Sequence, residues 1–141
     1  MKNMAVFKWS ESKAVHLPEV DAEHRSLFQL AADFQAALEK HAPQSTLDKL
    51  VDALFQEAED HFTHEERMMR AARYSLLQWH KSQHDTMRKN GKALAKRIRK
   101  GDREAGQELL QVLAHWLRDH MSVADNMMAA SIRNHHRGHA A

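Results

Sequence analysis

Hydrophobic residues recur at intervals of three and four positions in four segments of the chain. Polar and charged residues fill the positions between them, so each segment has one apolar side and one hydrophilic side. This spacing is typical of amphipathic α-helices whose apolar faces pack against a common core. The four hydrophobic series are Leu27 to Leu38, Leu47 to Ala58, Leu77 to Ile98, and Leu110 to Met128.

Short polar stretches separate these segments and predict where the helices begin and end. The first helix is expected to end near "KHAPQS". Ser45 and Ser75 are each followed three residues later by Asp or Gln, the spacing of a capping box, so the second and third helices are expected to begin there. Gly101 is expected to end the third helix, and the fourth is expected to begin after Asp102.

Four amphipathic helices with short connections predict an all-α fold, an up-down-up-down four-helix bundle. The 141 residues form a single domain of ordinary size. Residues 1–20 are expected to form an extended N-terminal arm, and residues 133–141 a flexible tail.

Composition narrows the possible classes of function. The chain has 4 Gly and 2 Pro, which favours helix, and no Cys, which excludes disulfides and thiolate metal sites. It has no apolar run long enough to span a membrane, and no signal peptide core follows the first methionine, so we expect a cytoplasmic protein without a membrane partner. The net charge of +2 does not indicate a nucleic-acid partner, and the basic run "RKNGKALAKRIRKGDR" is interpreted as a solvated helix face. The unusual residue is histidine, with 12 copies.

Polar residues occupy positions that continue the apolar side of the second helix. In "HFTHEERMM", His61 and Glu65 follow the hydrophobic series at the same spacing and are expected to face inward. His64 and Glu66 fall beside that series, nearer the rim or solvent.

Histidines also lie on the inward sides of the other three helices. His80 and His84 stand one turn apart on the third helix, His24 on the first, and His120 on the fourth. Asp125 follows His120 by five residues, which places it about 140° away around an ideal α-helix. A local distortion of the helix is one way for both to face inward.

A single inward histidine is most often an ordinary core residue. Five imidazoles and a glutamate on four inward faces are costly to bury without strong partners, which favours a metal site. The set is too large for one ion and suits two, and without thiolates the plausible metals are iron, zinc or manganese. The chain contains neither the Glu-x-x-His motif of carboxylate-rich di-iron proteins nor the His-Glu-x-x-His motif of zinc proteases.

Five stretches together resemble the hemerythrin family, in its bacterial single-domain form: "FKW", "EVDAEHRSLF", "HFTHEERMM", "WHKSQH" and "HWLRDHMSVAD". The resemblance implies two non-haem iron ions joined by an oxo or hydroxo bridge. It implies that one iron is bound by three histidines, the other by two with one coordination position open, and that two carboxylates bridge them. Carried over in that order, the ligands are His80, His84 and His120; His24 and His61; and Glu65 and Asp125.

The resemblance also implies dioxygen as the ligand of the open position. An apolar pocket around it is expected to be lined by Leu27, Phe62, Trp116, Leu117 and Met121. Reversible dioxygen binding, for carriage, storage or buffering, is favoured over an enzyme, because oxygen-cleaving di-iron enzymes generally use more carboxylates. The alternatives are a di-iron enzyme or sensor acting on peroxide, nitric oxide or oxygen, and metal storage.

Overall fold

The computed structural model describes residues 7–140, with side chains described as far as residue 138. These residues form helices and no strands. In chain order the elements are a 3-10 turn η2 (Glu11–Lys13), α1 (Pro18–Glu39), α2 (Gln44–Ala71), α3 (Leu77–Arg99), α4 (Arg103–Asp119), a π-helical turn η3 (His120–Ala124) and α5 (Asp125–Ala140).

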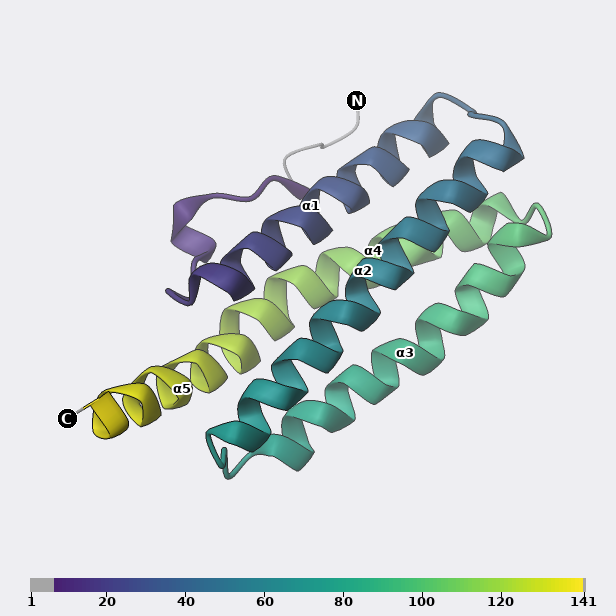
Figure 1. The fold of residues 1–141 in the computed structure, drawn as a ribbon. Helices are drawn as coiled ribbons and strands as arrows, with labels where there is room; N and C mark the ends of the chain where they lie inside the picture. The colour runs from purple at the N-terminus through teal and green to yellow at the C-terminus, as the bar shows by residue number, and fades with distance from the viewer. Residues whose placement is uncertain (1–6, 141) are drawn as a thin grey trace.

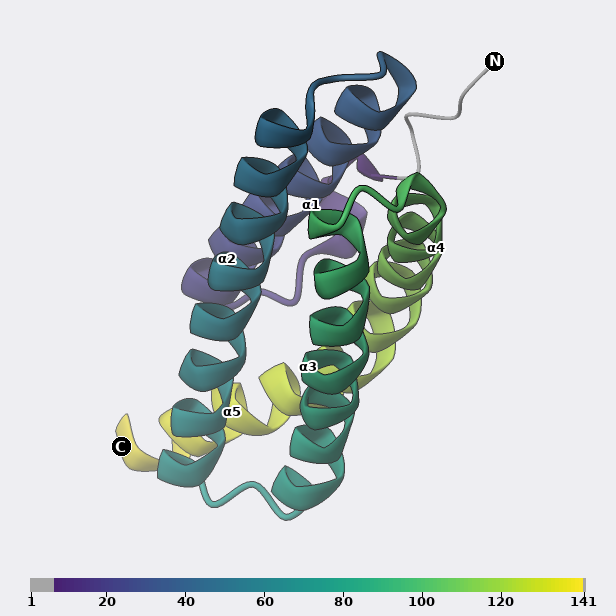
Figure 2. The same ribbon diagram turned by 90° about the vertical axis from the view of Figure 1, so that its right-hand side faces the viewer.

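The helices form the predicted up-down-up-down four-helix bundle. Helices α1 to α4 run in alternating directions, as Figure 1 shows, and each of the first three packs against the next. Helix α4 also packs against α1, which closes the bundle into four corners (Figure 2). Helices α4 and α5 follow one another through η3 without a loop, and Figure 2 shows the chain changing direction there. Such bends commonly accompany a π-helical turn.

Two of the predicted helix starts are wrong. Helix α2 begins after Pro43 and α3 after Leu76, and no side chain caps either end. At α2 the carboxylate of Asp48 accepts a hydrogen bond from the side chain of Gln44 at 2.7 Å, so the expected capping box does not form. The start of α4 is as predicted, because Asp102 accepts the N–H of Ala105.

The described part of the N-terminal arm, residues 7–17, lies against the bundle. The arm ends three residues earlier than predicted, because α1 already begins at Pro18. The Asp21 carboxylate of α1 accepts the N–H groups of Val15 at 2.8 Å and His16 at 3.2 Å, and Arg133 of α5 donates to the Val15 carbonyl. The segment predicted as a flexible tail continues α5 as helix to Ala140. Residues 1–6 and 141 lie outside the described part of the chain.

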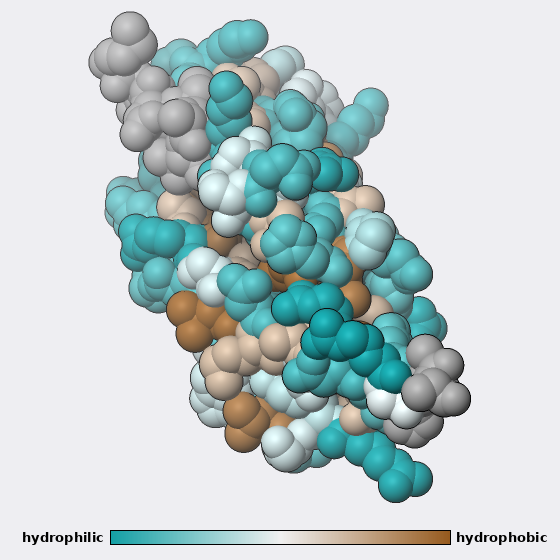
Figure 3. Space-filling model, turned by 90° about the vertical axis from the view of Figure 1, so that its left-hand side faces the viewer, coloured by the Kyte–Doolittle hydropathy of each residue, from teal (hydrophilic) through white to brown (hydrophobic). Residues whose placement is uncertain are grey.

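The apolar core has two main parts along the bundle axis. The larger includes Phe34, Leu54 and Leu109, and the smaller, around Met69 and Met128, lies towards the other end. The seven inward polar residues predicted from the sequence lie between the two. Outside the core the surface is mostly hydrophilic, with apolar side chains in small separate groups on the face that Figure 3 shows. Within residues 7–140, no helix is both long and apolar enough to cross a membrane.

Candidate metal centre

The π-helical turn explains how His120 and Asp125 reach the same interior. The backbone N–H of Asp125 donates to the carbonyl of His120, five residues earlier, where an α-helix would bond four residues apart. The turn therefore takes up one extra residue and brings both side chains to the inner side, where their exposed fractions are 5% and 0%. The helix is locally distorted, which was one hypothesis for how both side chains could face inward.

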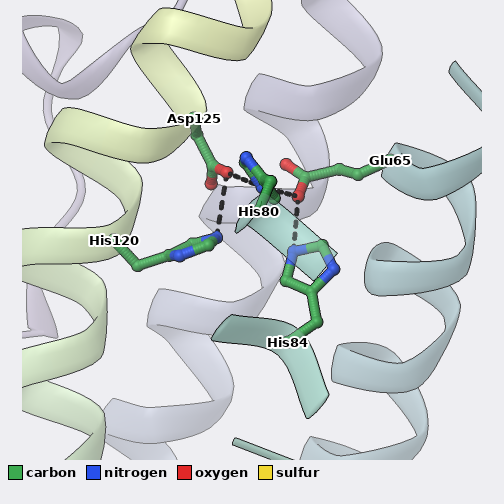
Figure 4. A group of neighbouring side chains, drawn as sticks. All are labelled: Glu65, His80, His84, His120 and Asp125. Atoms are coloured by element: carbon green, nitrogen blue, oxygen red, sulfur yellow. Dashed lines mark hydrogen bonds and ion pairs between the residues drawn. The ribbon is translucent and has the colours of Figure 1, made fainter. Parts of the chain in front are cut away.

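Three histidines and two carboxylates converge on one side of the site (Figure 4). The Nε2 atoms of His80 and His84 lie 3.2 Å and 3.0 Å from Oε1 of Glu65. Asp125 Oδ1 lies 3.0 Å from Nε2 of His80 and 3.1 Å from Nε2 of His120. One oxygen of each carboxylate thus serves the three-histidine group.

The second oxygen of each carboxylate faces a two-histidine group. Glu65 Oε2 lies 3.1 Å from Nε2 of His61 and 3.8 Å from Nε2 of His24. Asp125 Oδ2 lies 3.0 Å from Nε2 of His24. Two sets of possible ligand atoms, with three and two imidazoles, therefore share the same two carboxylates, one oxygen to each set. All seven residues predicted as ligands are brought together.

The arrangement of the nitrogen and oxygen atoms suits binding to two cations better than hydrogen bonding among the side chains themselves. All seven residues are buried, each no more than 5% exposed. Several of the inward atoms have no hydrogen-bond partner, including Nε2 of His24, His61 and His120 and both oxygens of Asp125. Buried polar groups in folded proteins are normally paired, so a cluster of unpaired lone pairs aimed at one another is what metal ions would satisfy.

Three polar residues hold the outer nitrogens of the ligands. His61 Nδ1 lies 2.6 Å from Glu23, His84 Nδ1 2.8 Å from Glu66, and His120 Nδ1 2.8 Å from Gln83. Each is an oxygen acceptor, so it favours the tautomer with the proton on Nδ1 and leaves Nε2 free for a metal.

These three acceptors were not predicted from the sequence, and Glu66 was expected near the rim or solvent. Glu66 is in fact buried, 6% exposed, and also accepts a hydrogen bond from Arg88 at 2.9 Å. Each acceptor is the sequence neighbour of a ligand on its own helix and serves the ligand of the next helix. The neighbour precedes the ligand on α1 and α3 and follows it on α2. This alternation follows from helix direction. Seen from one end of the bundle, successive residues turn clockwise in helices that run one way and anticlockwise in helices that run the other way.

The same rule fails at the fourth corner of the bundle. There the neighbour of His120 is Met121, which borders a cavity together with His24 of α1. A thioether is a weak acceptor, and Nδ1 of His24 has no hydrogen-bond partner. The two-histidine group therefore has one imidazole held by a carboxylate and one that is not.

Charge favours ionised carboxylates at the site. Burial opposes ionisation of Glu65, but the facing imidazoles, His61 first, hold the pKa of its carboxyl well below the usual range. Burial likewise opposes protonation of the imidazoles, yet Glu65 and Glu23 raise the pKa of His61 to about 10. Asp125 and Glu65 raise the pKa of His80 to about 9. The carboxylates thus attract positive charge, whether protons on imidazole or metal ions.

Residues 15–132 match the family model described as the hemerythrin HHE cation binding domain. The chain belongs to the hemerythrin family. A bacteriohemerythrin of Ralstonia nicotianae is 33% identical over 129 residues, which cover 89% of this chain and 88% of that protein. A bacteriohemerythrin of Aquifex aeolicus is 34% identical over 87 residues, 60% of this chain and 66% of that protein. A myohemerythrin of Theromyzon tessulatum is 29% identical over 119 residues, 84% of this chain and 88% of that protein. The resemblance inferred from the sequence is confirmed.

Two cavities of the hemerythrin domain adjoin the metal centre. The residues expected to line an oxygen pocket are Leu27, Phe62, Trp116, Leu117 and Met121. All but Met121 border a cavity of about 370 Å³, and Met121 borders one of about 400 Å³ that reaches His24. Leu117 borders both. The Phe62 ring stacks on His84 with centroids 4.3 Å apart, and Trp116 stacks on His120 at 3.9 Å. The two aromatic rings therefore form an apolar wall directly against the ligands, and a role in admitting oxygen stays a prediction.

Proposed function

We propose that this protein binds two non-haem iron ions and, at one of them, binds dioxygen reversibly. The observation that carries the proposal is the sharing of two buried carboxylates, one oxygen each, between a three-histidine and a two-histidine group. Carboxylates that face two cations in this way offset the repulsion between them. The hemerythrin family binds iron and oxygen, which favours iron among the metals that suit imidazole and carboxylate.

The two ions would have unequal protein ligands. His80, His84 and His120 would hold one, and His24 and His61 the other, with Glu65 and Asp125 common to both. The ion with fewer protein ligands is the one at which an external ligand would bind. An oxo or hydroxo bridge derived from solvent would complete the pair. When bound, the irons would supply the redox chemistry that dioxygen binding requires.

The chain's own residues would restrict what reaches the ions. The cavity of about 370 Å³ is lined in part by Leu27, Phe62 and Leu117, each no more than 5% exposed. An apolar wall of this kind excludes water and protons from a reactive site. Glu23, Glu66 and Gln83 would hold the imidazole rings in fixed orientations, so that the ligand geometry changes little between states.

The test begins with the metal content of the purified protein, followed by reduction without air and admission of oxygen. We expect two irons per chain and a visible absorption band that appears with oxygen and fades when oxygen is removed. Irreversible oxidation, or rapid turnover of peroxide, would instead support the enzyme alternative. A response to nitric oxide or oxygen transmitted to a partner protein would support a sensor.

A ligand variant tests the assignment of residues. His80→Ala is expected to lose at least one iron and the oxygen-dependent band, because His80 faces both carboxylates. His115→Ala is the matched control, since His115 lies on α4 with a side chain 71% exposed and touches no ligand. A His80→Ala protein that kept two irons and its oxygen response would overturn the assignment.

A further inference from the structure

The cavity of about 370 Å³ extends well beyond the metal centre. Its volume falls within the range of about 300–1,000 Å³ that is usual for small-molecule sites. The exposed residues on its border, Glu59 of α2 and Lys92 and Arg99 of α3, place its mouth between these two helices, which run side by side in Figure 2. From there the cavity reaches the buried Phe62 and the half-buried Trp116.

Its walls between mouth and interior are hydrocarbon. Leu54, Leu113 and Leu117, each 5% exposed or less, border it from α2 and α4. The ring of Phe55 borders it near the mouth and lies against α3 at Gly91, where an added Cβ would come within 2.5 Å of the ring. A space lined in this way favours an alkyl chain, which gains free energy in proportion to the apolar area it buries.

The charged groups at the mouth are mostly positive, and one of them is free. Arg88 is paired with Glu59, with N–O distances of 2.9 Å and 3.1 Å, and Arg99 is paired with Asp52. Lys92 is exposed, and within the part of the chain that the structure describes it has no ion pair and no side-chain hydrogen bond. An ammonium group at the edge of an apolar cavity is suited to the anionic head of an amphiphile.

We propose that this cavity binds a medium-chain carboxylic acid, with its carboxylate at Lys92 and its alkyl chain along Phe55, Leu113 and Leu117 towards Trp116. The unpaired ammonium of Lys92 at the mouth disfavours a positively charged head group. The buried ring of Phe62 limits how far the alkyl chain reaches into the bundle. The proposal does not depend on oxygen binding at the metal centre, although a bound chain would press on the rings that stack on His84 and His120.

The first test measures the binding of hexanoate, octanoate and decanoate to the full-length purified protein by calorimetry. The affinity is expected to rise about fourfold for each added methylene, the factor that corresponds to burying one such group, until the cavity is filled. Decyltrimethylammonium, with the same tail and the opposite charge, is expected to bind weakly or not at all. Equal binding of the two head groups, or affinity that does not depend on chain length, would overturn the proposal.

The second test removes the proposed head-group partner. Lys92→Ala is expected to weaken decanoate binding by roughly fivefold, as for the loss of one exposed ion pair, and to leave binding of uncharged decanol unchanged. Lys89→Ala is the matched control, because Lys89 is an exposed lysine of α3 that does not border the cavity. The same decanoate affinity in both variants would refute the role of Lys92.

The third test fills the cavity from within. Ala58 of α2 borders it and is only partly buried, so Ala58→Leu is expected to reduce decanoate affinity at least tenfold, as the lost burial of two methylenes implies. Ala58→Val adds less volume and serves if the leucine variant does not fold. Unchanged decanoate binding in a folded variant would show that the ligand binds elsewhere on the surface.

Discussion

Glu66 offers the sharpest test of how the metal centre is held together. Its carboxylate accepts from Nδ1 of His84 at 2.8 Å, and the His84 side chain is fully buried. In Glu66→Ala that N–H would lose its acceptor, and a buried donor left unpaired costs about 1–3 kcal/mol. Removing an outer partner of a metal-binding histidine typically costs a factor of about 10–100 in affinity, about 1.4–2.7 kcal/mol. The free-energy cost expected from the lost metal affinity therefore lies within the range expected for the unpaired N–H group.

The measurement is competition for the metal between the protein and a chelator of known affinity, without air. We expect Glu66→Ala to weaken metal binding about 10- to 100-fold, and Glu66→Gln, which keeps an acceptor oxygen, to lose less. Glu59→Ala is the control, because Glu59 also pairs with Arg88 but reaches no ligand. If Glu66→Ala binds metal as tightly as the unmodified protein, or Glu59→Ala weakens binding equally, the role assigned to Glu66 is refuted.

Further measurements address other parts of the structure. Gly91→Ala places a Cβ within 2.5 Å of the facing phenylalanine ring and is expected to destabilise the fold by about 1–3 kcal/mol in urea unfolding. Gly138→Ala, which meets nothing within 4 Å, should be neutral or stabilising in the same assay. Asp102→Ala removes the N-terminal cap of α4. The pKa of the Asp102 carboxyl is lowered by the hydrogen bond from the backbone N–H of Ala105 and by Arg97. Its stabilisation is therefore present above the usual Asp pKa and lost as pH falls through the lowered value, so the urea midpoints of variant and parent should converge in acid. Met121→Gln offers an acceptor to His24 and is expected to tighten metal binding in the chelator competition, whereas Met121→Leu is not. Removal of bound metal by a chelator should lower the thermal midpoint, because the ions bind the folded chain; an unchanged midpoint would argue against a site that stabilises the fold.

The sequence predicted the helices and their inward residues because burial imposes a strict spacing on both. His61 and Glu65 continue the hydrophobic series of α2, and they are buried as that series requires. The capping residues were less predictable. At the start of α2 the side-chain amide of Gln44 donates to Asp48 at 2.7 Å and to the carbonyl of Ile98 at 2.8 Å. A contact with a residue 54 positions away cannot be read from local spacing.

Two features of the site could not be predicted from the spacing of hydrophobic residues, each for its own reason. In the π-helical turn the backbone N–H of Asp125 bonds five residues back instead of four, and nothing in "HMSVAD" by itself indicates that change. The acceptors Glu23, Glu66 and Gln83 lie off the apolar faces, so a search along those faces passes over them. Once the helix directions are known, they can be found as the polar neighbours of ligands on the side of the next helix.

The hydrogen bonds by which α1, α2 and α3 each hold a histidine of the following helix have a consequence for the hand of the bundle. Four helices of this sequence could turn the same seven donor residues inward in either of two arrangements, clockwise or anticlockwise about the axis. In the opposite arrangement Glu23, Glu66 and Gln83 would project towards the wrong neighbour, and the buried imidazoles of His61, His84 and His120 would face no acceptor. The polar residues beside the proposed ligands therefore fit only one hand of the bundle. Tight metal binding would accordingly report that the four helices are arranged with that hand.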